Sequence, residues 1–155
     1  MEIQKAAVIS NCNLYRYFLS RKWGEGKKML IIGLNPSIAD ASIDDPTIRR
    51  CIGFAKREDY GELWMANLFA FRSTDPKGLK TTVDPIGKEN TQYLIDLSQK
   101  ADLTVVAWGT LGDYLNRDQE VLKLLKNPHC FGKTKNGSPK HPLYLALNTL
   151  IIPFY

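Results

Sequence analysis

The segment KMLIIGL, residues 28–34, decides the fold class that the sequence predicts. Its apolar run is short and has no polar alternation, which is typical of a strand covered on both faces. The turn-forming stretch Gly-Leu-Asn-Pro-Ser follows at residues 33–37. Asp45-Pro46 then predicts a helix start, because aspartate caps a helix and proline suits its first position. The segment therefore opens a strand–turn–helix unit.

This pattern recurs along the chain. We expect further buried strands at residues 63–69 and 102–108, a helix from Asp84-Pro85, and another helix after Gly109. Shorter strands are expected at 129–132 and 150–154, and an edge strand or hairpin at 14–23. Alternating strands and helices predict an α/β fold, a three-layer α/β/α arrangement with a mainly parallel central sheet. The length fits a single domain over residues 1–155.

Composition narrows the class of protein. The chain is 44% hydrophobic and 24% charged, and from its apolar runs, which are only strand-sized, we expect neither a secretory leader nor a membrane span. Its three cysteines lack a CxxC spacing, so we expect a reduced, cytoplasmic protein without a metal site. The net charge of +5 permits nucleic-acid binding. No GxxxxGK[ST] or GxGxxG motif is present, and no cofactor is expected.

Polar residues stand where the predicted strands end. Asn35 follows the first strand, Asn67 lies near the end of the second, and His141 lies in a later loop rich in glycine, proline and lysine. In open α/β sheets, ligands bind outside the carboxyl ends of the strands. These three residues are therefore the leading candidates for a functional site.

The same three motifs resemble the uracil-DNA-glycosylase superfamily. They are Gly33-Leu34-Asn35-Pro36, Asn67 in ANLF, and His141-Pro142. The resemblance implies that Asn35 positions a water, Asn67 reads the base and His141 stabilises the departing base. Asn35 replaces the carboxylate of the best-known uracil enzymes, and Leu-Tyr follows His-Pro where those enzymes have serine. These departures imply slower chemistry or a better leaving group, and a target other than uracil.

The chain is more similar still to a family of small bacterial and phage proteins classed as a domain of unknown function. Three stretches carry this resemblance: NPSIADASIDDPTIRR at 35–50, NLFAFRSTDP at 67–76 and GKTKNGSPKHPLY at 132–144. The distribution of that family implies hypermodified phage pyrimidines as targets and a role in antiviral defence.

Each candidate catalytic residue also has a structural alternative. Asn35 can simply shape a turn. The carboxylate that the motif lacks can come from Asp44 or Asp40, which otherwise are solvated loop charges, whereas Asp45 is better explained as a helix cap. The amide of Asn67 can recognise the edge of a pyrimidine, or it can make a buried hydrogen bond that supports the fold. His141 can likewise have only a structural role.

Aromatic and basic residues beside the motifs are the candidates for contacts with DNA. Phe69 and Tyr144 are expected to stack on an extruded base, or else to pack in the core. Predicted phosphate contacts, with a solvated loop as the alternative, are Lys133, Lys135, Ser138, Lys140 and Arg72.

The sequence thus predicts a monofunctional DNA glycosylase that flips a modified or damaged base, hydrolyses its N-glycosidic bond and leaves an abasic site. No lysine is placed as an amine nucleophile, so no lyase activity is expected. DNA is the expected partner. The alternatives are an enzyme that acts on free nucleosides or nucleotides, and a non-catalytic DNA-binding module.

Overall fold

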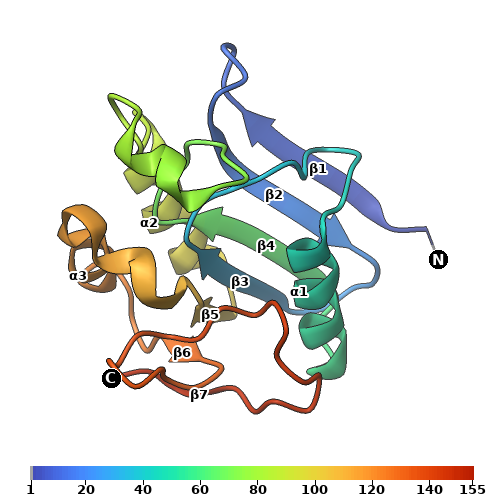
Figure 1. Ribbon diagram of the computed structural model, residues 1–155. Helices are drawn as coiled ribbons and strands as arrows, with labels where there is room; N and C mark the ends of the chain where they lie inside the picture. Colours follow the sequence, from blue (N-terminus) through green and yellow to red (C-terminus); the bar gives the residue numbers. More distant parts are fainter. Residues whose placement is uncertain (1) are drawn as a thin grey trace.

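The computed structural model describes residues 2–155 and shows an α/β fold built on one seven-stranded sheet (Figure 1). The strands are β1 (Gln4–Ile9), β2 (Arg16–Lys22), β3 (Lys28–Gly33), β4 (Glu62–Asn67), β5 (Leu103–Val106), β6 (His129–Cys130) and β7 (Ile152–Pro153). The helices are α1 (Pro46–Arg57), α2 (Asn90–Lys100) and α3 (Arg117–Leu122), with 3₁₀ turns η1 (Pro76–Lys80) and η2 (Gly109–Asn116).

The sheet is mixed, in the order β1-β2-β4-β3-β5-β6-β7. Its four central strands, β4, β3, β5 and β6, are parallel. The pairings β1–β2, β2–β4 and β6–β7 are antiparallel. The predicted α/β class is confirmed, and parallel pairing is limited to the centre because β1 and β2 form a hairpin and β7 folds back on β6. β2 lies inside the sheet, with β1 as the edge strand.

Helices cover both faces of the sheet (Figure 1). Met29 and Ile31 of β3 belong to the hydrophobic cluster that includes α1, whereas Leu30 and Ile32 belong to the cluster that includes α2. Consecutive side chains of a strand point to opposite faces, so a strand buried on both faces must be apolar throughout. This explains the run at residues 28–34.

The predicted start of the first helix is confirmed, and that of the second is wrong. Asp45 caps α1 by accepting a hydrogen bond from the Ile48 amide at 2.9 Å, and Pro46 is the first helical residue. Asp84 instead closes a turn, with its carboxylate accepting from the Gly87 amide at 3.1 Å. Gly87 has a φ of +93°, which ends any helix there, and α2 begins at Asn90.

Three parts of the chain meet at the carboxyl edge of the parallel strands. Gly33 at the end of β3 pairs with Asn67 at the end of β4. Arg16, at the start of the antiparallel strand β2, reaches the same edge, where its amide bonds to the Ala70 carbonyl at 2.9 Å. The loop after β6 returns to the same edge and is held by the bond from the Gly109 amide to the Pro139 carbonyl. Among residues 2–155, no helix is long and apolar enough to cross a membrane.

Candidate functional site

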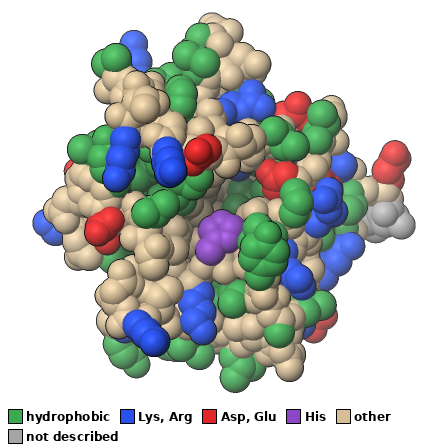
Figure 2. All heavy atoms as spheres, in the orientation of Figure 1, with side chains coloured by type: hydrophobic (Ala, Val, Ile, Leu, Met, Phe, Trp, Pro, Cys, Tyr) green, Lys and Arg blue, Asp and Glu red, His purple; other side chains and the backbone are tan. Residues whose placement is uncertain are grey.

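A cavity of about 480 Å³ opens at the carboxyl edge of the sheet and continues into an inner recess of about 60 Å³. Its volume falls within the roughly 300–1,000 Å³ of small-molecule sites. Figure 2 shows a hollow on this face, with a histidine side chain beside it and basic side chains around it. Residues that line both the cavity and the recess are Leu34, Asn35, Ser37, Asp45, Thr47 and His141.

The Asn35 side chain is held firmly by the loop around it. Its Nδ2 donates to the Ser73 carbonyl at 2.8 Å and to the Pro36 carbonyl at 3.1 Å. Carbonyl oxygens only accept, so these two bonds fix which end of the amide is nitrogen. The amide oxygen makes no hydrogen bond within the described residues. Asn35 can therefore present a fixed acceptor to a water or a ligand.

Asn67 lies at the inner recess and is 4% exposed. Its Oδ1 accepts from Arg16 Nη2 at 3.4 Å. A Cβ added at Gly33 would lie 3.0 Å from Asn67 Nδ2, so the glycine at the end of β3 leaves room for this amide. The Nδ2 group of Asn67 is therefore a hydrogen-bond donor that has no partner within residues 2–155.

His141 lines both the cavity and the recess and is exposed to solvent. Its Nδ1 accepts from the Leu143 amide at 3.1 Å, so Nε2 carries the proton of the neutral ring. Desolvation by the surrounding protein lowers the pKa of His141, and the charge of Asp45 partly opposes that shift. At neutral pH the ring is a neutral imidazole with Nε2–H as a donor.

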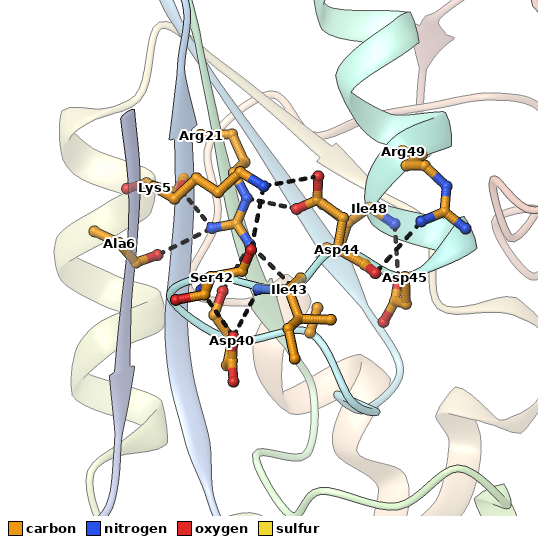
Figure 3. A network of polar contacts seen from close by, with 12 residues as sticks. Lys5, Ala6, Arg21, Asp40, Ser42, Ile43, Asp44, Asp45, Ile48 and Arg49 are labelled. Carbon is orange, nitrogen blue, oxygen red and sulfur yellow. Dashed lines mark hydrogen bonds and ion pairs between the residues drawn. The ribbon is translucent and has the colours of Figure 1, made fainter. Parts of the chain in front are cut away.

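Asp44 and Asp40, the aspartates that the sequence offered for the missing carboxylate, line neither the cavity nor the recess. Asp44 pairs with Arg21 Nε at 2.7 Å and with Lys5 at 3.5 Å, and it lines neither the cavity nor the recess (Figure 3). The Asp40 carboxylate accepts from the amides of Ser42 and Ile43, which lower its pKa.

Asp45, expected only to cap α1, lines both the cavity and the recess. It is 8% exposed, and its Oδ1 accepts from Ile48. Its Oδ2 has no hydrogen-bond partner in the described chain. The carboxylate that reaches the site is therefore one residue further along than the sequence reasoning placed it.

The two predicted stacking residues lie outside the cavity, in opposite environments. Phe69 is fully buried and packs on Tyr114 with ring centroids 5.8 Å apart, so it belongs to the core. Tyr144 is 90% exposed and lies beside Arg49 and Arg50 in a shallow surface groove. Trp108 instead lines the cavity, as part of the segment that follows β5.

The predicted phosphate contacts also lie outside the cavity. Lys133 Nζ donates to the Tyr155 carbonyl, and Arg72 donates to Asn13 Oδ1 at 2.9 Å. Lys135 and Lys140 are exposed. Ser138 is half-buried in a tight turn closed by the bond from the Thr134 amide to the Ser138 carbonyl. None of these five side chains lines the cavity or the recess.

Sequence reasoning missed Arg16, which lines the recess. Only its position at the start of an antiparallel strand brings it to this edge, and no motif marks it. Within residues 2–155, no group of three or more histidine, cysteine, aspartate or glutamate side chains is arranged to hold a metal ion. Its amide and ionisable side chains are therefore two amides, one imidazole, one carboxylate and one guanidinium, beside the hydroxyls of Ser37 and Thr47.

Comparison with known proteins identifies a family. No curated protein and no solved structure matches the chain. One family profile, described as "Protein of unknown function (DUF1643)", matches residues 16–143. This range contains Arg16, Asn35, Asp45, Asn67 and His141, so the match includes the whole candidate site. Because it spans most of the chain, the protein belongs to the DUF1643 family.

Proposed function

We propose that the protein hydrolyses the N-glycosidic bond of a modified or damaged base in DNA and leaves an abasic site. One observation carries this proposal. Asn35, Asn67 and His141 come from three separate segments of the chain and line one recess. A fold of the uracil-DNA-glycosylase type is part of the same proposal, and it rests on the order of these three motifs. A hypermodified phage pyrimidine is the proposed target, in antiviral defence.

The attacking water is activated by Asn35 and Asp45. Asn35 Oδ1 is a free acceptor and holds one water hydrogen, and the carboxylate of Asp45 takes the other proton. The water oxygen bonds to C1′ of the sugar as the C1′–N bond breaks, and the electron pair leaves with the base. Asp45 thereby supplies the carboxylate that the Asn-Pro motif lacks.

The departing base is stabilised by donors. The Nε2–H of His141 and the Nδ2 group of Asn67 both donate toward the region where negative charge develops on the base. A neutral histidine suits this role, because Nδ1 remains free to accept from the Leu143 amide. No lysine within the described residues lines the cavity or the recess, which fits a monofunctional hydrolase without lyase activity.

Contacts with DNA are proposed for exposed basic and aromatic residues outside the cavity. Lys135, Lys140 and Arg49 are exposed, and Tyr144 presents its ring to solvent in the same surface groove as Arg49. Phosphate contacts by lysine and arginine make affinity fall steeply with added salt.

The deciding experiment is mass spectrometry of the bases released from genomic DNAs that carry different modifications, followed by alkali treatment to reveal abasic sites. The wild type is expected to release one class of base and to produce alkali-labile breaks. Asn35→Ala, His141→Ala and Asp45→Asn are each expected to lower the rate by roughly 100-fold or more. Asp96→Asn is the matched control, because this exposed carboxylate lies on α2 and lines neither the cavity nor the recess, and it should retain activity.

Two other results would each support a different function. Turnover of mononucleosides that does not depend on salt would identify an enzyme of free nucleosides or nucleotides, a candidate that the position of the lysines outside the cavity favours. Tight DNA binding with every base intact across the panel would leave a DNA-binding module.

A further inference from the structure

Three arginines are almost fully buried, and Arg16 differs from the other two. Arg16 is 3% exposed, Arg21 0% and Arg117 1%. Arg21 pairs with the Asp44 carboxylate at 2.7 Å, and Arg117 pairs with Glu120 at 2.5 Å. Arg16 takes part in none of the ion pairs of residues 2–155. It is a buried cation without an anionic partner.

The guanidinium of Arg16 also has unused donors. Its Nη1 donates to the Ala39 carbonyl at 3.1 Å and its Nη2 to Asn67 Oδ1 at 3.4 Å. Nε is buried and has no partner within the described residues. A guanidinium carries five N–H donors, so these two bonds leave most of its capacity open. Leaving buried donors unpaired is costly, and the groups concerned are often completed by a ligand or a water.

Arg16 keeps its charge in this setting. Burial lowers its pKa to about 10, and the nearby charges of Arg72 and Arg21 act in the same direction while that of Asp45 opposes them. The group is therefore protonated at neutral pH. A charged donor makes hydrogen bonds roughly twice as strong as those of a neutral one.

We propose that the inner recess is a subsite for an oxygen acceptor of the ligand, a carbonyl or carboxylate oxygen, which Arg16 and Asn67 bind together. The recess of about 60 Å³ matches the share of about two water molecules, so it admits one such group and not a whole base ring. The ring of the ligand then lies in the outer cavity of about 480 Å³. The subsite deepens the proposed function, and it rests on that function only for the identity of the ligand.

Arg16 also positions Asn67. Its bond to Oδ1 directs that oxygen toward the guanidinium and leaves Nδ2 as the donor toward the recess. Arg16 and Asn67 thus present donors to the same small space, and a ligand edge that carries only N–H groups finds no free acceptor on either of them. The arrangement selects ligands by an oxygen on the edge that enters the recess.

The test uses nuclear magnetic resonance of the full chain, with the Nε–H signals of the buried arginines as reporters. The probes are acetate, acetamide and ethylammonium, which are an anionic acceptor, a neutral carbonyl and a donor-only cation. Acetamide or acetate is expected to shift the Arg16 signal in a saturable way, and ethylammonium is not. Arg21 and Arg117 are internal controls, because their Nε groups are already bonded to Asp44 and to the Leu68 carbonyl.

The outcomes separate the possible sources of the oxygen. A shift with both acceptor probes identifies a carbonyl-type site, and a shift with acetate alone identifies a carboxylate site. Arg16→Lys, checked for folding by circular dichroism, keeps the positive charge but removes the planar guanidinium with its several N–H donors. It should weaken probe binding roughly tenfold. An Arg16 signal that does not move, or that moves together with those of Arg21 and Arg117, overturns the subsite and leaves a buried water on Nε.

Failure of the subsite and failure of the proposed function are distinguishable. Probe binding at Arg16 without any base release refutes the hydrolase alone. Base release with an Arg16 signal that does not respond to the probes refutes the subsite alone.

Discussion

At the scale of single residues, the site depends on which atoms are already bonded. Asn35 uses its nitrogen on the surrounding loop and keeps its oxygen free. His141 uses Nδ1 on its own loop and keeps Nε2–H free. The local backbone therefore selects one chemical role for each side chain, an acceptor for Asn35 and a donor for His141.

The first prediction concerns His141 and pH. Folding lowers its pKa below the ordinary 6.5, so the unfolded chain takes up the proton first as the pH falls. The stability that depends on neutral His141 is fully present above pH 6.5 and is lost below it. Between pH 7.5 and 5.5, wild type should lose slightly more stability than His141→Gln, a small difference because the residue is exposed to solvent. Urea unfolding at both pH values measures this, and equal losses would contradict it.

At the scale of elements, the start of α1 combines two roles in Asp45. One carboxylate oxygen caps the helix, and the same side chain lines the cavity. A helix cap and a catalytic carboxylate can coincide because capping uses only one of the two oxygens. The sequence assigned Asp45 to the cap, and the structure confirms that assignment; only the structure shows that the same side chain also lines the cavity.

The second prediction separates the two roles of Asp45. Asparagine also caps helices well, so Asp45→Asn should change stability by less than about 0.5 kcal/mol, whereas Asp45→Ala should cost about 1 kcal/mol. Base release should fall in both variants, because both lack the charge. Thermal unfolding alongside the release assay checks this. An Asp45→Asn protein with full activity would assign Asp45 to the cap alone.

At the scale of the whole molecule, buried arginines join segments that are distant in the sequence. Arg21 of β2 donates to Asp44, to the Asp40 carbonyl and to the Ile43 carbonyl, and so holds the loop after β3 against the hairpin (Figure 3). That loop begins at Asn35 and ends at Asp45. Its anchoring keeps both residues at the cavity.

The third prediction tests this anchor with a double-mutant cycle. Arg21→Met should cost about 3–5 kcal/mol, because it leaves the Asp44 charge without its main partner in a partly buried place. Adding Asp44→Leu should recover part of that loss, since the two residues are directly paired. Guanidinium unfolding of the four proteins gives the coupling energy. Additive losses would show that the pair does not hold the loop.

The sequence by itself determined the α/β class, the central strands, the cap of α1 and three of the residues that line the recess. These depend on local rules: apolar runs of strand length, the chemistry of helix starts, and polar residues where strands end. The position of Asn35 and Asn67 at one edge followed because parallel strands end on the same side.

Only the tertiary structure decided the rest. Arg16 reaches the site because β2 is antiparallel to β4, and a strand's direction depends on its partners and not on its own residues. Asp44 and Asp45 are neighbours of the same type, and the side chain that faces Arg21 was separated from the one that faces the cavity only by the path of the loop. Phe69 and Tyr144 are likewise aromatic residues beside a motif, yet packing buries one and exposes the other. Contacts between segments that are distant in the sequence set the positions of these side chains, and a local sequence pattern cannot predict such contacts.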